Sequence, residues 1–404
     1  MSNFAFGTYR VSDYNPQHIQ ALKEAVDSGI TMIDTSSNYM DGGAERAIAL
    51  ALRDVDDTTK ENIEIVSKVG YIQGENLSRH KESAFDEVVE YGDDCFHSIS
   101  KTFIKDQLTH SLKRLEMQKL DCYLLHNPEY YLFDAIKNNV DKDDRLDEIY
   151  LRIYRAFVAL EEEVSAGRIG SYGISSNSFS KVSTSDEFLP FEDLITIADR
   201  ASEDVGNDTH SFTTIQLPIN MLETQGLKCA SWAKENGLRV LANRPLNIQL
   251  ESSMYRLADY DEPTEYYHHL NELLEVCNNK MLSPLYNLFE ELDGSKHKFG
   301  WVGDYDSFFY AQIIPHIQTT LKNLDEENRV TIINFIDMFF IEYRKMVLFE
   351  CSKNTRNTLK DSFGDCDLSM QECAIKFLMN STLIDFILVG MRKPSYVNEI
   401  LTIS

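Results

Sequence analysis

Four side chains of complementary chemistry lie at the ends of apolar, strand-like runs in the first third of the chain. They are a carboxylate, a phenol, an ammonium and an imidazole: Asp34, Tyr39, Lys68 and His126. Groups of these types that meet at one point form a device for moving a proton to or from a substrate. The first question for the sequence is therefore which elements could bring them together.

The expected role of each of these four side chains follows from elementary acid–base chemistry. A tyrosine in water has a pKa near ~10, and a nearby ammonium favours the phenolate. We expect Lys68 to lower the pKa of Tyr39, Asp34 to hold Lys68 in place, and His126 to hydrogen-bond with a substrate oxygen. Such a site suits the reduction of a carbonyl, with hydride added to carbon and Tyr39 donating the proton to oxygen.

Each residue taken alone has a structural interpretation. A tyrosine near a Gly-Gly turn commonly packs, and a single lysine commonly lies in solvent. Asp34 could cap the turn that follows it, and His126 could be a buried core histidine. The prediction of a site rests on their conjunction at the ends of successive strand candidates.

The elements that must position these residues alternate strand and helix signals. The strand candidates are Phe4 to Tyr9, Thr31 to Ile33, Ile63 to Val69, Asp121 to Leu125, Ile169 to Ile174, Thr213 to Leu217, Leu238 to Leu241 and Leu383 to Val389. Helical patterns lie between them at Pro16 to Asp27, Ala44 to Leu52, Phe103 to Leu115, Ile149 to Ala166, Phe191 to Ala201, Leu222 to Asn236 and Leu368 to Asn380. This rhythm predicts an α/β fold, a (β/α)8 TIM barrel whose active site lies at the carboxyl ends of its strands.

Two stretches are longer than the barrel needs. Residues 72–99 are polar and lengthen the loop after the third strand candidate. The second stretch follows the seventh candidate and has helical periodicity in Tyr266 to Val276 and Glu326 to Phe349. We predict a barrel from residues 1–246 and 368–404, with a mostly helical insertion at 247–367 between the seventh and eighth strands. This insertion serves as a lid or a protein-partner surface, or it decorates the outer wall.

Composition narrows the class of protein. The 404-residue chain has a net charge of -26, which argues against nucleic acid and anionic membranes as partners. No apolar run approaches the ~20 residues of a membrane span. Seven scattered cysteines without a CxxC pair indicate free thiols and no structural metal site. Residues 1–10 lack the features of a signal peptide, so we expect a cytoplasmic protein.

Taken together, these motifs resemble those of the aldo-keto reductase family. The run Asp34-Thr35-Ser36-Ser37-Asn38-Tyr39 with Gly42-Gly43-Ala44-Glu45, then Ser67-Lys68 and Leu124-Leu125-His126, is similar to the family's catalytic segments. The resemblance assigns the catalytic tetrad to Asp34, Tyr39, Lys68 and His126. It also implies cofactor-binding residues, which are Thr8, Asp34, Ser175, Ser176, Asn177, Gln216, Asn243, Arg244, Pro245, Leu246, Gly390, Arg392 and Lys393.

The cofactor segments carry both a cationic patch and departures from the family pattern. Arg244, Arg392 and Lys393 could bind a phosphate, which favours NADPH, with NADH as the alternative. Asn243 stands where the family usually has an aromatic residue that stacks on the nicotinamide. Ser176 stands where the family often has asparagine. No Gly-x-Gly-x-x-Gly follows a strand, so a doubly wound dinucleotide fold is not supported.

The sequence therefore predicts an NAD(P)H-dependent oxidoreductase that reduces an aldehyde, ketone or sugar, or catalyses the reverse reaction. Its partner would be a small carbonyl or alcohol substrate. The alternative is a nucleotide-binding sensor or interaction module with little turnover, acting through the insertion. A third hypothesis, a barrel lyase without redox chemistry, would not bind nicotinamide.

Overall fold

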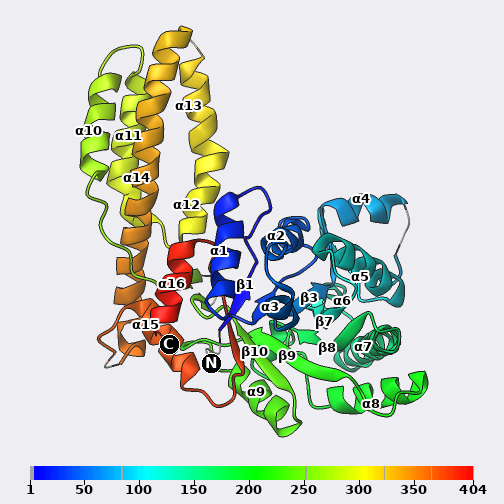
Figure 1. Ribbon diagram of the computed structural model, residues 1–404. Helices are drawn as coiled ribbons and strands as arrows, with labels where there is room; N and C mark the ends of the chain where they lie inside the picture. Colours follow the sequence, from blue (N-terminus) through cyan, green and yellow to red (C-terminus); the bar gives the residue numbers. More distant parts are fainter. Residues whose placement is uncertain (1–3, 83–84, 251–252, 323, 365, 404) are drawn as a thin grey trace. The chain divides into compact units, whose positions relative to one another are not determined.

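A computed structural model describes residues 4–82, 85–250, 253–322, 324–364 and 366–403 (Figure 1). Eight strands, all paired in parallel, close into a barrel in the order β1-β13-β10-β9-β8-β7-β3-β2. Their bounds are β1 Phe4–Gly7, β2 Met32–Asp34, β3 Glu64–Val69, β7 Leu120–His126, β8 Ile169–Ser175, β9 Phe212–Pro218, β10 Arg239–Asn243 and β13 Phe386–Val389. The predicted (β/α)8 TIM barrel is confirmed, and each of the eight strand candidates overlaps a barrel strand.

Parallel strands covered by helices are buried on both faces, which is why they read as near-continuous apolar runs. The barrel core contains side chains from several strands, including Ala5, Val66 and Leu241. Polar side chains appear where the strands end. Asp34 is the last residue of β2, and His126 is the last residue of β7. The alternation of strand and helix therefore gathers these groups at one end of the barrel.

Helices follow the barrel strands, as the sequence pattern predicted. They are α1 Pro16–Asp27, α2 Gly43–Leu52, α3 Asp57–Glu61, α5 Lys101–Leu115, α6 Tyr130–Lys137, α7 Lys142–Ser165, α8 Leu194–Val205, α9 Gly226–Glu235, α15 Met370–Met379 and α16 Pro394–Ile403. The sequence determines where α5 starts, because Ser100 caps the helix and its side chain accepts a hydrogen bond from the Phe103 backbone N–H. Helix α16 packs beside α1 (Figure 1), and the Asn398 amide donates to Glu24.

The polar stretch after β3 contains regular structure that the sequence did not predict. It forms β4 Tyr71–Ile72, α4 Glu75–Glu82, β5 Val89–Gly92 and β6 Cys95–His97. The three strands pair as a small antiparallel sheet in the order β4-β6-β5. Each strand has only two to four residues, too few for an alternating pattern to stand out in the sequence.

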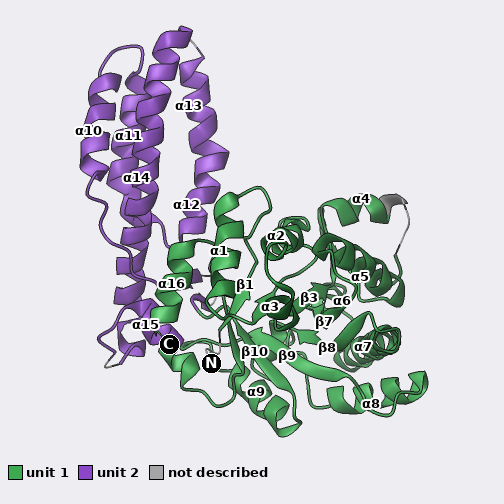
Figure 2. Ribbon diagram, viewed as in Figure 1, with its two compact units in different colours: residues 1–245, 376–404 green, residues 246–375 purple. Residues whose placement is uncertain are grey.

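The chain divides into two compact units, residues 1–245 with 376–404, and residues 246–375 (Figure 2). We call the first the barrel unit and the second the helical unit. The helical unit begins with a hairpin of β11 Asn247–Leu250 and β12 Ser253–Arg256. Its main helices are α10 Tyr266–Cys277, α11 Ser283–Ser295, α12 Val302–Phe308, α13 Ile314–Leu321 and α14 Glu326–Thr358. An insertion between the seventh and eighth barrel strands is thus mostly helical, whereas its status as a separate domain at 247–367 stays a proposal.

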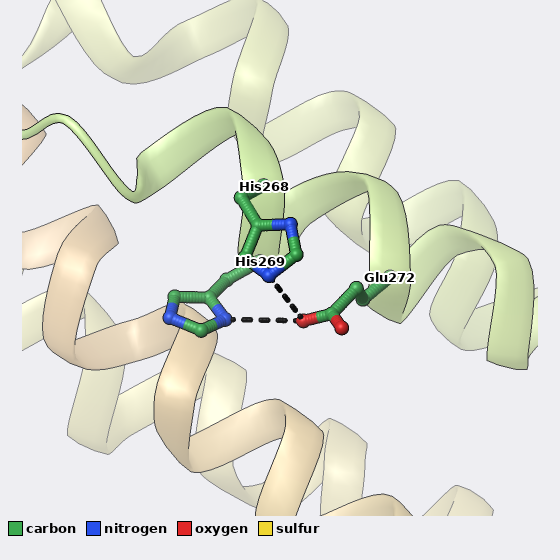
Figure 3. Close-up of side chains that lie close together, drawn as sticks. All are labelled: His268, His269 and Glu272. Atoms are coloured by element: carbon green, nitrogen blue, oxygen red, sulfur yellow. Dashed lines mark hydrogen bonds and ion pairs between the residues drawn. The ribbon is translucent and has the colours of Figure 1, made fainter.

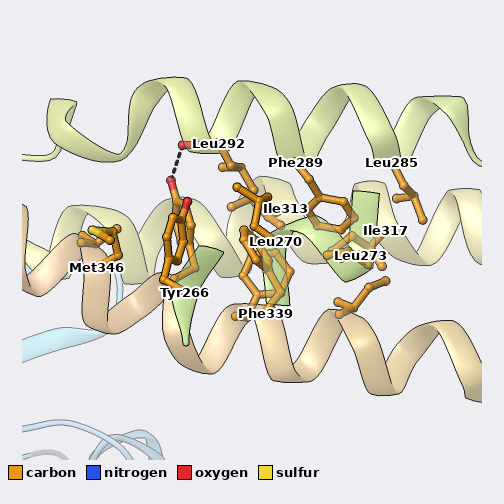
Figure 4. Packing of buried hydrophobic residues seen from close by; sticks show 14 of the residues in the cluster. Tyr266, Leu270, Leu273, Leu285, Phe289, Leu292, Ile313, Ile317, Phe339 and Met346 are labelled. Carbon is orange, nitrogen blue, oxygen red and sulfur yellow. Dashed lines mark hydrogen bonds between the residues drawn. The ribbon is translucent and has the colours of Figure 1, made fainter. Parts of the chain in front are cut away.

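The helical unit has an aromatic and aliphatic core of its own (Figure 4). Phe339 is fully buried, with ring centroids 5.3 Å from both Phe289 and Tyr343. The Tyr343 hydroxyl donates to the Leu292 carbonyl at 2.8 Å, so its polar end is satisfied. Each such side chain contributes roughly 1.5–3 kcal/mol on burial. The aromatic content that the sequence displayed is therefore used for packing within this unit.

The structure also bears on two predictions made from the sequence, one about the cysteines and one about membrane-spanning segments. Cys366 and Cys373 form a disulfide, so the expectation that all cysteines are free thiols is wrong. Five others are free thiols, namely Cys95, Cys122, Cys229, Cys277 and Cys351. Within the described residues, every helix is too short or too polar to traverse a lipid bilayer.

Candidate active site

A continuous chain of hydrogen bonds crosses the carboxyl ends of the barrel strands. The Lys68 ammonium donates to Asp34 Oδ2 at 2.7 Å and to the Thr35 carbonyl at 2.8 Å. The same Nζ lies 3.5 Å from the Tyr39 hydroxyl oxygen. Lys68 is fully buried and Asp34 is nearly so, whereas Tyr39 is half-buried. The structure thus places three members of the predicted tetrad in direct contact.

The turn after β2 aims Tyr39 back at this pair. Met40, Asp41 and Gly42 have φ values of 50°, 53° and 77°, so the chain reverses sharply through the left-handed region. Glycine adopts this region without a steric penalty. Gly43 is also confined, because a Cβ there would lie 2.8 Å from Asp13 Oδ1. The turn that positions the phenol therefore favours glycine at position 42, whereas a side chain at position 43 would require Asp13 to move.

The glutamate of the same motif ties the turn to the barrel. Glu45 is fully buried in the first turn of α2. Its Oε1 accepts from Ser67 at 2.7 Å, and its Oε2 accepts from Arg114 Nε at 2.6 Å. Ser67 immediately precedes Lys68 in β3. Glu45 therefore connects the helix that follows the Tyr39 turn to the strand that carries the ammonium.

The electrostatics correct one expectation. Desolvation, and then the charge of Asp34, raise the pKa of Tyr39 well above its usual value, whereas the sequence predicted that Lys68 lowers it. Burial also raises the pKa of Asp34 and lowers the pKa of Lys68, against their mutual attraction. The Lys68 ammonium donates its short hydrogen bonds to Asp34 and to the Thr35 carbonyl, and the negative charge of Asp34 offsets its effect on the Tyr39 phenol. Tyr39 consequently keeps its proton at neutral pH.

His126 joins the site from β7. Its ring lies edge-on to Tyr39, with centroids 5.9 Å apart, and its Nδ1 is 3.1 Å from Ser36 Oγ. Burial, and then the Lys68 charge, lower the pKa of His126 well below its usual value, so the imidazole is neutral. Ser36 gives its own proton to Asn38 Oδ1 at 2.7 Å. This leaves Nδ1–H of His126 as the donor to Ser36 and Nε2 as an acceptor.

The hydrogen-bond chain continues into the segment predicted to hold a nicotinamide amide. Gln216 donates to Asp34 Oδ1 at 2.7 Å, and its Oε1 accepts from Ser175 at 2.9 Å. The Asn243 amide lies 3.4 Å from the same oxygen. Ser175, Gln216 and Asn243 belong to consecutive barrel strands, β8, β9 and β10. The structure thus joins these three predicted cofactor residues to the tetrad.

The predicted cationic patch consists of Arg244, Arg392 and Lys393, and Arg244 is paired with a carboxylate. Arg244, at φ 52°, donates to Glu223 Oε1 at 3.0 Å, a partner that the sequence did not indicate. Desolvation lowers the pKa of Arg244. Arg392 and Lys393 follow β13, the strand that pairs with β10, so they lie at the neighbouring strand end. Lys393 is exposed, with its Nζ 5.5 Å from the Tyr396 ring centroid.

The remaining predicted cofactor residues have varied roles. Thr8 is buried and donates to the Asp34 carbonyl at 2.9 Å, so its hydroxyl supports the tetrad backbone. Ser176 is buried and accepts from the Ser178 N–H, whereas the Asn177 side chain is exposed. Pro245 is buried and Gly390 is exposed. Leu246 belongs to the helical unit and is not assigned to the barrel site.

Sequence reasoning missed Glu129, which follows Pro128 after β7. Its Oε1 accepts from the backbone N–H groups of Asn177 at 2.8 Å and Ser178 at 3.2 Å, so it fixes the loop after β8. Its Oε2 has no partner among the described residues. Burial raises the pKa of this carboxyl to about 7. A carboxylate directly after the His126-Asn127-Pro128 segment was the available signal, but its partners lie 48 and 49 residues further along the chain.

An aromatic wall next to His126 was also missed. The Tyr71 ring lies edge-on to the His126 ring, with centroids 4.8 Å apart. The Asn127 amide donates to the Tyr71 hydroxyl at 2.6 Å, and His97 Nε2 lies 2.7 Å from the His126 carbonyl oxygen. Burial lowers the pKa of His97 to about 4, so this ring is neutral and donates. The small β4-β6-β5 sheet therefore supports the histidine end of the site.

The donor set fits a dinucleotide with an amide and phosphates. Asn243 Oδ1 and Arg244 Nε are buried and lack partners among the described residues. An unpaired amide oxygen suits a carboxamide N–H, and an unpaired guanidinium N–H suits a phosphate oxygen. Such orphaned groups cost free energy in isolation, so a polar ligand at these strand ends would restore their hydrogen bonds.

The fold and site define a class of protein, a (β/α)8 barrel with a buried hydrogen-bond network at the carboxyl ends of its strands. A family model narrows this further, because the model of the Aldo/keto reductase family matches residues 3–404. The chain belongs to the Aldo/keto reductase family, which supports an oxidoreductase that uses a nicotinamide cofactor and acts on small carbonyl compounds. The comparison with curated proteins gave no match.

Several solved structures are similar to this chain. An aldo/keto reductase from Klebsiella pneumoniae, solved with NADP and acetate, is 22% identical with a TM-score of 0.38; the match covers 61% of this chain and 65% of that chain. An aldo-keto reductase from Bacillus halodurans in its holo form is 15% identical with a TM-score of 0.48, covering 100% and 86%. A glycerol dehydrogenase from Gluconobacter oxydans is 16% identical with a TM-score of 0.47, covering 99% and 85%.

Proposed function

We propose that this protein is an NADPH-dependent oxidoreductase that interconverts a carbonyl compound and its alcohol, with Tyr39 as the general acid and base. The observation that carries the proposal is the buried Lys68 ammonium, which contacts Asp34 at 2.7 Å and lies 3.5 Å from the Tyr39 hydroxyl oxygen. A fully buried ammonium carries a desolvation cost of about several kcal/mol, which its hydrogen bonds to Asp34 and the Thr35 carbonyl offset. Its position beside a phenol at the strand ends supports proton transfer.

The chain's own residues would act as follows. Tyr39 holds a proton at neutral pH and gives it to the substrate oxygen during reduction. Lys68 then stabilises the phenolate that is left, because the two atoms are already close. Asp34 keeps Lys68 charged and oriented through the hydrogen bond at 2.7 Å. When bound, a reduced nicotinamide supplies the hydride.

His126 would orient the substrate. Its neutral ring points Nδ1 at Ser36, so Nε2 is the acceptor at the site. An acceptor nitrogen suits the hydroxyl of an alcohol, or a hydroxyl next to the reacting carbon of a sugar. Thus the hydrogen-bond network favours substrates rich in hydroxyl groups over simple hydrophobic ketones.

The preference for NADPH over NADH rests on the strand-end cations. Arg392 and Lys393 lie after β13, next to the strand end that carries Arg244. We assign Arg392 and Lys393 to an additional phosphate, because both are cationic and both lie at the strand end beside that of Arg244.

The test begins with the purified full-length protein. We expect NADPH to bind with quenching of tryptophan fluorescence and with saturation. A panel of aldehydes, ketones and sugars, with their alcohols in the reverse direction, is then followed at 340 nm, the nicotinamide absorbance. Turnover of a member of the panel supports the proposal. Absence of nicotinamide binding would overturn it and favour a lyase.

A second candidate function is a nucleotide-binding sensor. It is favoured by Asn243, which offers no aromatic face to a nicotinamide, and by the separate core of the helical unit. Tight NADPH binding without turnover across the whole panel would select this function. The helical unit would then be the interaction surface.

A further inference from the structure

Helix α10 of the helical unit carries a cluster of metal-ligating side chains outside the barrel site. His268, His269 and Glu272 point toward one another in its first turns (Figure 3). Glu272 Oε2 lies 3.4 Å from His268 Nε2 and 3.3 Å from His269 Nδ1. The three donor atoms all lie within 4.8 Å of one another. This combination of two imidazoles and one carboxylate has no role in the proposed redox chemistry.

The separations match those of ligands around a shared ion. Zn²⁺ binds histidine nitrogen and carboxylate oxygen at about 2.0–2.2 Å in tetrahedral sites, which places neighbouring donors about 3.3–3.5 Å apart. The observed 3.3 and 3.4 Å are compatible with this spacing between donor atoms, and the 3.3 Å pair, His269 with Glu272, also forms a hydrogen bond. The donor nitrogens of the two imidazoles lie within 4.8 Å of each other.

The surroundings leave room for an ion and a further ligand. The side chains of His268, Glu272 and His269 are 61%, 38% and 20% exposed, so one coordination position faces water. Lys296 is a cation near the start of α10, with its Nζ 5.9 Å from the Tyr267 ring centroid. Its charge is compensated by Asp293 Oδ1 at 2.6 Å. Because Lys296 pairs with Asp293, we expect the negative charge of Glu272 to be available to a bound cation.

We propose that His268, His269 and Glu272 form a binding site for a divalent transition-metal ion of the Zn²⁺ class. Two imidazole nitrogens select zinc, copper or nickel over magnesium and calcium, which prefer all-oxygen ligands. Three protein ligands leave a position for water or for a donor from another molecule. The site belongs to the helical unit and does not depend on the proposed redox function.

The first test measures Zn²⁺ affinity in the full-length protein by competition with a chromophoric chelator. We expect stoichiometric binding that weakens by more than about tenfold in His269→Ala and in Glu272→Gln. His316→Ala removes an exposed histidine from α13 of the same unit and should leave the affinity unchanged. Equal affinity in wild type, His269→Ala and Glu272→Gln, or absence of Zn²⁺ binding, would overturn the proposal.

A second test identifies the donor atoms by a spectroscopic signature of the wild-type protein and compares it with two variants. Electron paramagnetic resonance of one equivalent of Cu²⁺ should show superhyperfine coupling to two nitrogens. His316→Ala should leave this spectrum unchanged, whereas His268→Ala should reduce it to one nitrogen. A spectrum without nitrogen coupling, or one dominated by sulfur, would show that the ion binds elsewhere.

Discussion

The barrel unit and the helical unit use their buried polar and aromatic residues in opposite ways. The barrel buries a connected polar network at its strand ends, where Asp34, Lys68 and Gln216 are joined by direct hydrogen bonds. The helical unit buries aromatic rings, with Phe339 and Tyr343 at its centre. Its candidate metal site lies on the surface of α10, away from that core. The barrel unit keeps charged groups buried despite their desolvation cost, whereas the helical unit is stabilised by the burial of apolar and aromatic side chains.

This contrast predicts different responses to mutation. A buried ion pair is strongly destabilising when one partner is removed, because the other charge is left unpaired. An aromatic core is destabilised through a cavity instead. The two tryptophans allow each unit to be followed separately, since Trp232 lies in α9 of the barrel and Trp301 in the helical unit.

Removal of Lys68 should have the largest effect. Lys68→Met leaves the Asp34 carboxylate buried without its partner, and we expect the barrel to lose about 3–5 kcal/mol of unfolding free energy. Urea denaturation in a Trp301→Phe background, followed by Trp232 fluorescence, measures this loss. The double variant Lys68→Met with Asp34→Asn should recover much of it, and both variants should be inactive.

A matched surface lysine provides the control. Lys101 is half-exposed and pairs with Glu162 at 2.6 Å, and Lys101→Met should cost at most about 1 kcal/mol. If Lys68→Met were no more harmful than Lys101→Met, burial of the Lys68–Asp34 pair would not make the loss of one partner costly.

Truncation of Phe339 should destabilise the other unit. Phe339→Ala removes a fully buried ring and should cost about 3–5 kcal/mol, seen in Trp301 fluorescence in a Trp232→Phe background. In the Trp301→Phe background, the Trp232 transition should stay in place, because the helical unit has its own core. Tyr310→Ala, at a ring that is 72% exposed, is the control. Equal shifts of both transitions would show that the units unfold as one.

Glu129 should make barrel stability depend on pH. Its pKa of about 7 in the folded chain lies above the ordinary value of 4.5, so the unfolded chain releases this proton first as pH rises. The unfolding free energy should therefore fall as pH rises from about 4.5 through about 7, by about 3 kcal/mol in total. Glu129→Gln keeps the acceptor for Asn177 and Ser178 and should remove this contribution.

The measurement for Glu129 is urea denaturation at several pH values, with Glu61→Gln as the exposed control. The difference between wild type and Glu129→Gln should grow from pH 5 to pH 8. A constant difference over this range would mean that Glu129 is already ionised in the folded protein at pH 5.

Arg392 should give the smallest effect, confined to the cofactor. Arg392→Ala should weaken NADPH by about tenfold and leave NADH nearly unchanged, since one lost phosphate contact is worth about 1.4 kcal/mol. Fluorescence titration with both cofactors measures the ratio of affinities. Arg53→Ala, at the far end of α2 from the strand ends, is the control. Equal weakening of NADPH and NADH would remove Arg392 from the phosphate site.

The fold was predictable because the barrel strands are continuous apolar runs that end in polar residues. All eight strand candidates, and the helical periodicity predicted from Tyr266 to Val276, correspond to elements of the structure. The short strands between Tyr71 and His97 were not predictable, because two to four residues carry too little pattern. The Cys366–Cys373 disulfide was also missed, since spacing alone does not show which thiols meet.

The proximity of several predicted site residues could be inferred from the sequence, whereas their electrostatics could not. The sequence names Asp34, Tyr39 and Lys68, and the structure brings them into contact. The raised pKa of Tyr39 depends on desolvation and on the direction in which the Lys68 ammonium points. The Arg244–Glu223 pair likewise depends on distances in the fold that residue types do not reveal.

The central claim, that Tyr39 is the proton donor, is tested most directly by kcat of Tyr39→Phe on the best substrate of the panel. The variant removes one hydroxyl and retains the ring between Tyr9 and His126. The account predicts a loss of about 10²–10⁴-fold in kcat, with NADPH affinity and barrel stability essentially unchanged. A variant that turned over at a rate close to wild type would contradict it.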